Sequence, residues 1–118
     1  MEKNTRPPGK TTIAPEVLLS IARLNTLSVP GVSHLSVTPG DVEQLIKRGT
    51  SEGVKILVEN GVVYLDIYVV MNRDVNVREV GRDIQAHVHR AISELVGMEV
   101  GKINIHVEDI DFSTSPKA

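Results

Sequence analysis

The chain has 118 residues, of which 41% are hydrophobic and 24% charged, with a formal net charge of −2 and a pI near 6.1. This fits one globular domain and provides no global basic field to attract a polyanion. Cysteine is absent, which excludes disulfides, thiolate catalysis and cysteine-ligated metal, and aromatic residues make up only 3%. The core must therefore be aliphatic, and few rings are available to stack on nucleobases.

Segment 1–9 is polar and rich in proline, and we expect it to be a flexible tail, like segment 113–118. Segment 10–112 between them predicts a single domain without internal repeats. The first residues lack the apolar core of a secretory signal, and no run approaches the roughly 18 apolar residues that a membrane span needs. The expected location is the cytoplasm.

A helix is predicted from Pro15 to about Leu27. Proline suits the first turn of a helix, and Pro30-Gly31 prevents the helix from continuing. Apolar residues recur along it at helical spacing and are expected to face the core: Val17, Leu18, Ile21, Leu24 and Leu27.

Shorter elements flank this helix. Lys10–Ile13 and Val32–Val37 predict short strands, the second because apolar and polar residues roughly alternate. A turn at Thr38-Pro39-Gly40 precedes Asp41–Arg48, which predicts one or two helical turns. The sequence assigns no role to segment 35–53.

Two β-rich runs on either side of Asn60-Gly61 predict a hairpin, since Asn-Gly favours the positive φ angles of a type I′ turn. The two-residue loop sets the register and places Lys55 opposite Asp66. One alternating set of side chains carries these two charges and both tyrosines, and is expected to face outward. The other set is wholly aliphatic and is expected to face the core: Val54, Ile56, Val58, Val63, Leu65, Ile67 and Val69.

A long amphipathic helix and a last strand follow the hairpin. Asn76 is the expected N-cap, with Glu79 completing a capping box, and Gly97 suits the position just after the helix. Segment 103–107 alternates between apolar and polar residues, which predicts a strand with one buried face. The helix carries an apolar stripe formed by Val77, Val80, Ile84, Val88, Ala91, Ile92 and Leu95.

The order helix, strand, hairpin, helix, strand predicts an α+β fold. We expect a two-layer sandwich in which two helices pack on one face of a small mixed β-sheet. The sheet is mixed if the second hairpin strand and the last strand run parallel, joined by a right-handed crossover through the long helix.

The sequence offers no recognisable catalytic, cofactor or metal site. His87 and His89 point about 200° apart on a helix and are badly placed to bind one ion together. Acids after a last strand more often blunt a sheet edge than catalyse, which applies to Glu108, Asp109 and Asp111. The helix face of Arg78, Arg82, Gln85 and His89 is polar and partly basic, which would suit an anion or nucleic acid. Acids lie nearby on the polar side of the helix, which is typical of an ordinary solvent-exposed surface: Glu79, Asp83 and Glu94. Nucleophile elbows, P-loops and dinucleotide fingerprints are absent from the sequence.

The outward face of the hairpin is the candidate partner surface. It carries more apolar and amphipathic residues than a fully solvated sheet face is expected to carry. Either another polypeptide contacts this face, or the N-terminal segment partly covers it. The residues are Leu57, Val62, Tyr64, Tyr68 and Val70.

Eight blocks, by their order and spacing, resemble the alkaline shock protein family of bacterial envelope stress proteins. They are Ile13–Val17, Ile21–Leu24, Val29–Val32, Gly53–Lys55, Val63–Val70, Val75–Val80 with Ile84-Gln85, Val96–Val100 and Ile103–Val107. The resemblance covers roughly residues 9–108. The chain departs from it at Leu35–Gly49, where many members carry a Gly-rich stretch, and at Asn72-Arg73-Asp74, where a Tyr-Gly pair is more usual.

This resemblance implies a non-enzymatic protein of the envelope, alkaline or general stress response, without cofactors or catalytic residues. It implies homo-oligomers and, for some relatives, attachment to the membrane through a small membrane-anchored partner. Other relatives are linked to the control of fatty-acid synthesis.

Two alternatives come from the residues themselves. The element order resembles KH-like nucleic-acid-binding or ribosome-associated modules, but the acidic pI, the missing G-x-x-G and the few aromatics oppose this. A small enzyme or ligand carrier would need a pocket with convergent polar groups, which the sequence does not predict.

Overall fold

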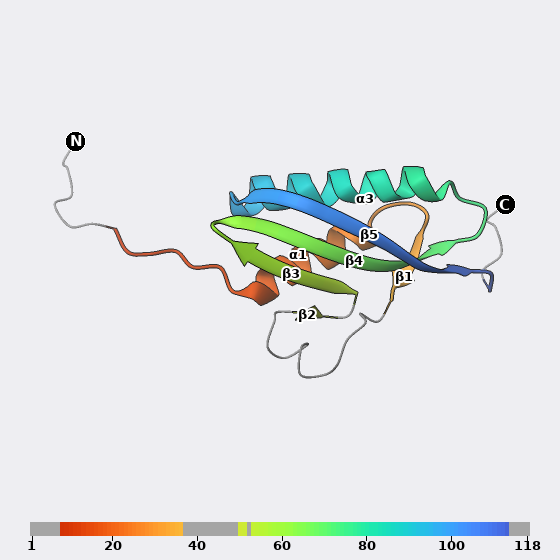
Figure 1. Cartoon of the computed structure of the whole chain (residues 1–118), viewed down its shortest axis with the longest axis horizontal. Coiled ribbons are helices and arrows are strands. Elements are labelled where there is room, and N and C mark those ends of the chain that lie inside the picture. The colour runs from red at the N-terminus through yellow and green to blue at the C-terminus, as the bar shows by residue number, and fades with distance from the viewer. Residues whose placement is uncertain (1–7, 37–49, 52, 114–118) are drawn as a thin grey trace.

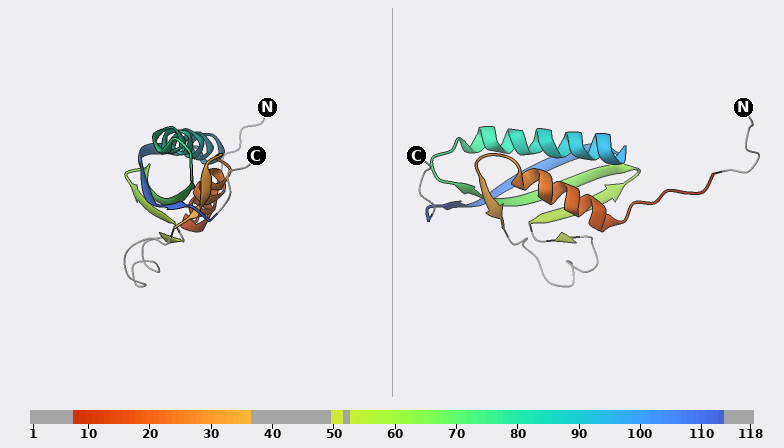
Figure 2. Two further views of the ribbon diagram at one scale, coloured as in Figure 1. Left: turned by 90° about the vertical axis from the view of Figure 1, so that its right-hand side faces the viewer. Right: turned by 180° about the vertical axis from the view of Figure 1, so that it is seen from behind.

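The structure is a computed structural model that describes residues 8–36, 50–51 and 53–113. Figure 1 shows a twisted sheet with helices α1 and α3 behind it, and the end-on view in Figure 2 shows both helices against the same side. This is the predicted α+β two-layer sandwich. In chain order the elements are α1 (Pro15–Leu27), β1 (Val32–Leu35), β2 (Thr50–Ser51), β3 (Val54–Glu59), β4 (Val62–Asn72), α3 (Val77–Ala91), the π-helical turn η1 (Ile92–Val96) and β5 (Glu99–Asp111).

Strand β4 is the centre of the sheet. β5 runs parallel to it along one edge for the whole length of β4, so the predicted mixed sheet is confirmed. Two antiparallel strands share the other edge: β3 pairs with the first half of β4, and β1 pairs with residues 69–71 near its end. β2 adds a short pairing on the outer side of β3.

The hairpin between β3 and β4 has the predicted turn and register. Asn60 and Gly61 take φ angles of 52° and 77°, the positive values of a type I′ turn. Glu59 pairs with Val62, and Lys55 pairs with Asp66. The register then fixes which side chains of β3 and β4 face the helices.

The core between sheet and helices is aliphatic, as the composition requires. The predicted core face of the hairpin is confirmed at Val54 and along β4, whereas Ile56 is half-buried and Val58 is exposed. Val58 lies at the open end of the sandwich, next to Ile13 at the entry to α1. The buried core residues are Leu18, Leu19, Ala22, Val29, Leu35, Val54, Val63, Leu65, Ile67, Val69, Met71, Val80, Ile84, Val88, Ile92 and Ile103.

Helix α1 has the predicted bounds, but its buried face is rotated from the predicted stripe. Val17 is exposed and Leu24 is 66% exposed, whereas Leu19, Ala22 and Thr26 are buried. The rotation follows from packing, because α1 contacts both α3 and the strands β1 and β3. The buried side of α1 is the side that faces the neighbouring helix and the sheet together. The Thr26 hydroxyl is satisfied inside the helix, where it donates to the Ala22 carbonyl at 2.8 Å.

The long helix begins as predicted, because the Asn76 side chain accepts a hydrogen bond from the Glu79 N–H at 3.1 Å. Its end differs. Residues 92–96 form a π-helical turn, in which the Gly97 N–H reaches the Ile92 carbonyl at 3.1 Å. A π turn contains more residues than an α-helical turn. The apolar side of the helix therefore continues from Ile92 to Val96, and the Leu95 side chain points outward. Leu95 is 73% exposed, so it lies outside the buried part of the predicted apolar stripe.

The remaining predictions concern short segments. Lys10–Ile13 is not a strand, because it has no strand beside it and forms an extended exposed segment before α1. β1 begins at Val32 as predicted and ends at Leu35. The helical turns predicted for Asp41–Arg48 lie outside the described residues.

The π turn predicts unequal losses of stability when the Ile92 and Leu95 side chains are each truncated. Ile92→Ala should lower the free energy of unfolding by about 2–5 kcal/mol, because it opens a cavity in the core. Leu95→Ala should change it by less than about 0.5 kcal/mol, because the side chain is in solvent. Urea unfolding followed by circular dichroism measures both values. A cost for Leu95→Ala equal to that of Ile92→Ala would show that the helix keeps its α-helical phase.

Candidate interaction surface

The structure divides the five predicted surface residues into two groups. Leu57 is 51% exposed, and Val62 and Tyr64 are half-exposed on the sheet face turned away from both helices. Tyr68 and Val70 are only 9% and 8% exposed, so they add little accessible area to this face. The accessible part of the predicted surface therefore lies at the hairpin end of the sheet.

Tyr64 is held against the neighbouring strand. Opposite Tyr64 the register of β5 shifts between Val100 and Ile103, which leaves a bulge at Gly101 and Lys102. A β-carbon at Gly101 would overlap the Tyr64 ring, so this position requires glycine. The Tyr64 ring thus lies over the backbone of β5 at Gly101, which limits where the ring can be placed.

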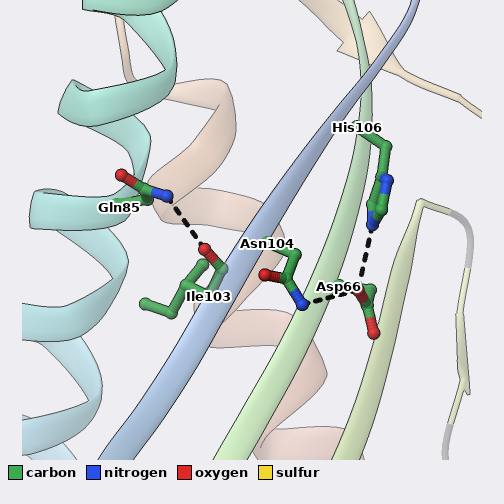
Figure 3. Close-up of polar contacts among 5 residues, drawn as sticks. All are labelled: Asp66, Gln85, Ile103, Asn104 and His106. Carbon is green, nitrogen blue, oxygen red and sulfur yellow. Dashed lines mark hydrogen bonds and ion pairs between the residues drawn. The ribbon is translucent and has the colours of Figure 1, made fainter.

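The middle of the outer face is a polar and aromatic cluster, in which Tyr68 is the buried member. Tyr68 stacks on His106 with ring centroids 4.4 Å apart and an interplanar angle of 13°. The Lys55 Nζ lies 5.6 Å from the centroid of the Tyr68 ring, a cation–π distance. Figure 3 shows Asp66 between Asn104 and His106: its Oδ1 accepts from Asn104 Nδ2 at 3.1 Å and contacts His106 Nε2 at 2.9 Å. These contacts tie β4 to both of its neighbours.

The cluster changes the acidity of Tyr68. Burial of the ring, followed by the charges of Asp66 and Glu108, raises the pKa of the Tyr68 hydroxyl above its ordinary value of 10.0. The neutral phenol is therefore the form that this site stabilises.

A second polar group joins the far ends of β5 and β1. Asp111 Oδ2 accepts from the Ser33 hydroxyl at 2.6 Å, and Asp111 Oδ1 accepts from the Ser113 N–H at 3.0 Å. Hydrogen bonds from Ser113 and Ser33 lower the pKa of the Asp111 carboxyl to about 2. These bonds stabilise the carboxylate and fasten the end of β5 across β4; they give it a structural role.

The other candidate residues do not converge. His87 and His89 are exposed on α3, and the His87 Nδ1 contacts the Asp83 carbonyl of the same helix at 2.8 Å. Within the described ranges, no three His, Asp or Glu side chains are grouped so that they could hold a metal ion. The Gln85 side chain reaches from α3 to β5, where its Nε2 donates to the Ile103 carbonyl at 2.9 Å (Figure 3).

An open apolar hollow lies at the end of the sandwich where α1 begins. Its volume is about 580 Å³. The only polar side chain in the lining is the hydroxyl of Thr11, which offers little to orient a substrate. The lining residues are Thr11, Ile13, Pro15, Leu18, Val58, Val96 and Met98. Such a lining lacks the convergent polar groups that characterise an enzyme site.

None of the helices in the described part of the chain is long and apolar enough to cross a bilayer. The sequence model of the alkaline shock protein 23 family, which has a cell envelope-related function, matches residues 3–112. The chain belongs to this family.

Two bacterial proteins are similar to this member of the family over most of their lengths. The uncharacterized protein YqhY of Bacillus subtilis (strain 168) is 30% identical over 108 residues, which cover 90% of this chain and 80% of YqhY. The uncharacterized protein Spy1535 of Streptococcus pyogenes serotype M6 is 33% identical over 110 residues, which cover 92% of this chain and 84% of Spy1535.

Among solved structures, the copper form of the MamM CTD is similar in fold. The TM-score is 0.59 at 12% sequence identity, and the match covers 86% of this chain and 92% of that domain. At this identity the likeness concerns the arrangement of helices and strands alone.

The raised pKa of Tyr68 predicts a specific loss of stability in alkali. A group whose pKa is higher in the folded state contributes stability that is fully present below its unfolded pKa and is lost as the pH rises through the folded pKa. The free energy of unfolding should therefore fall more steeply above pH 10.0 in the wild type than in Tyr68→Phe, which keeps the ring but has no hydroxyl.

The same shift can be measured directly. Tyr64→Phe leaves Tyr68 as the only tyrosine, so phenolate absorbance reports on one group. The titration midpoint should lie above 10.0, and a midpoint at or below that value would contradict the burial of the Tyr68 hydroxyl.

Proposed function

We propose that this protein acts without catalysis, by associating with copies of itself and with another polypeptide in a cell envelope-related role. The observation that carries the proposal is the exposed apolar group of Leu57, Val62 and Tyr64 on a sheet face that neither helix covers. A solvent-facing side of a sheet usually carries polar residues. A group of exposed apolar side chains on such a face is therefore typical of a contact site.

The chemistry of the described residues supports the non-catalytic part of the proposal. In the described part of the chain, the one histidine–carboxylate contact, His106 with Asp66, is engaged with Asn104 and Tyr68 and holds β4 and β5 together. Among the described residues, neither His106 nor Asp66 forms a hydrogen bond with a hydroxyl group, and the apolar hollow shares no residue with this contact. Membership of an envelope-related family fits a protein that works by contact.

We further propose that the other polypeptide is held in the membrane, so that a cytoplasmic protein becomes peripheral to the membrane through its partner. The envelope-related function of the family supports this location. Tyr64 is the natural anchor residue of the surface, because it is amphipathic, aromatic and already fixed over Gly101.

The self-association is tested by placing a charge in the exposed apolar group. Leu57→Glu and Tyr64→Lys should each weaken assembly by about thirtyfold or more, as expected for a contact residue worth about 2 kcal/mol. Multi-angle light scattering over a concentration series measures the mass, and circular dichroism confirms the fold.

Leu24→Glu is the matched control, because Leu24 is equally apolar and exposed but lies on α1, in the other layer. The proposal fails if the wild type is a monomer throughout, if the mass is unchanged in both surface variants, or if the control lowers the mass as much. Tyr68 is not a suitable position, because a charge there would replace a buried ring that stacks on His106.

The partner is tested by affinity capture from the native cell with membrane and soluble fractions analysed separately. A membrane protein captured in stoichiometric amount by the wild type and lost with Leu57→Glu supports the proposal. Capture of ribosomal RNA in its place would favour a nucleic-acid-binding role and contradict it.

A further inference from the structure

We propose that the free edge of β5 joins two copies of this chain, in antiparallel pairing around a two-fold axis at Ile105. This inference rests on the self-association proposed above and names the edge and the register. β5 has 13 residues and pairs only with β4 among the described strands, so its other edge presents backbone groups along the longest strand of the sheet.

The register of the hairpin shows which backbone groups face this edge. In a two-residue hairpin, Glu59 and Val62 form a hydrogen-bonded pair, so Val62 and every second residue after it direct their N–H and C=O groups toward β3. Leu65, Ile67 and Val69 therefore face β5, where they bond to residues 104, 106 and 108. The N–H and C=O groups of residues 103, 105 and 107 are left pointing away from the sheet.

The hydrogen bond from Gln85 agrees with this assignment, because it reaches the Ile103 carbonyl from helix α3, on the side away from β4. That carbonyl has a second lone pair, so it can accept another hydrogen bond. In the described part of the chain no other partner is found for the outward groups of Ile105 and Val107.

Two bulges limit the regular part of the edge. The register with β4 shifts between Val100 and Ile103, and again between Val107 and Asp109. The straight run that can accept a new strand is thus Ile103–Val107, and its central residue is Ile105. Pairing this run with a second copy of itself places Ile105 opposite Ile105, and uses the N–H and C=O of all three outward residues.

This register also matches side chains on the helix side of the sheet. Val107 comes opposite Ile103 of the second copy, and directly opposed residues share one face. Val107 is 37% exposed, although it faces the core side of β5. Beside Ile103 there is a shallow hollow of about 340 Å³ between α3 and β5, lined by Gln85, Ala86, His89, Gly101 and Ile103. The exposed valine of each copy would enter the hollow of the other.

Charges at the ends of the run are complementary in the same register. Lys102 and Glu108 flank the run at its two bulges, so each lies near the other residue of the second copy. The two-fold axis creates this pair twice. Asn104 comes opposite His106, which joins the two polar clusters across the contact.

The other open edge of the sheet is a poorer candidate. β2 pairs with Val54 and Lys55, which leaves only residues 56–59 of β3 free. Glu59 is the one charged residue in that run, so two copies cannot offer each other an opposite charge there. The longer edge with complementary charges is therefore the one assigned to the second copy.

Charge reversal tests the register with a built-in rescue. Lys102→Glu alone and Glu108→Lys alone each place two like-charge pairs in a homodimer, so each should raise the dimer Kd by on the order of tenfold. An equimolar mixture of the two variants restores two opposite-charge pairs in the mixed dimer and should return the Kd to the wild-type range. Sedimentation velocity at low salt measures all three. Lys10→Glu, with the same charge change in the extended N-terminal segment, is the control.

A backbone variant tests the edge itself. Val107→Pro removes an N–H that faces outward and takes no part in the β4 ladder, so the fold should survive while the dimer dissociates. Circular dichroism and thermal unfolding confirm the fold of this variant. If it unfolds, the rescue by mixing still decides the question.

The outcomes separate this inference from the proposed function. If mixing does not restore the dimer, or if Lys10→Glu weakens it as much as Lys102→Glu, the β5 contact is wrong. If the β5 contact fails in either way but Leu57→Glu still lowers the mass measured by light scattering, self-association occurs through the surface of Leu57, Val62 and Tyr64. The proposed function then stands. A wild type that is monomeric at every concentration overturns both.

Discussion

The hydrogen bonding of β4 on both of its edges is the constraint on which the rest of the structure depends. β5 occupies one edge throughout, and β3 and β1 divide the other. A strand held on both sides cannot slip by one residue without breaking two ladders and exchanging its two faces. The turn at Asn60-Gly61 therefore sets the register of the hairpin, and β4 passes the same alternation to β5 (Figure 1).

The two faces that result have different chemistry. Leu65, Ile67 and Val69 turn toward the helices and make an aliphatic core. Asp66 and Tyr68 turn the other way and join residues of β3 and β5 in a polar and aromatic cluster. This cluster occupies the middle of the outer face, so apolar side chains remain accessible only near the hairpin.

Local signals in the sequence were enough to predict the hairpin, the bounds of α1 and the start of α3. Each depends on a few adjacent residues: Asn60-Gly61 for the turn, Pro15 and Pro30 for the first helix, and Asn76 for the N-cap. The exposure of Leu95 could not be predicted in this way. It results from a π turn, which depends on a hydrogen bond from Gly97 to Ile92 rather than on a distinctive residue pattern.

The contacts that involve two distant strands were also missed. The burial of Tyr68 and the bond between Asp66 and His106 appear only when β5 lies parallel to β4, with Ile105 beside Ile67. The signal was available, because Leu65–Val69 and Ile103–Val107 alternate with the same period. Setting the two runs side by side would have brought Asp66, Asn104, Tyr68 and His106 onto one face. The rotation of α1 had no comparable signal, since it depends on how α1 meets α3.

The central place of β4 also has a consequence for the order in which the sheet assembles. The hairpin closes a loop of two residues, whereas β1 joins Val32 to Met71 and β5 joins Glu99 to Val62, each across a long stretch of chain. Short loops close quickly, and distant partners must wait for a much larger loss of chain entropy. A nascent chain would thus present its hairpin as a two-stranded template, and the kinetic barrier would lie in docking the late strands on either side of it.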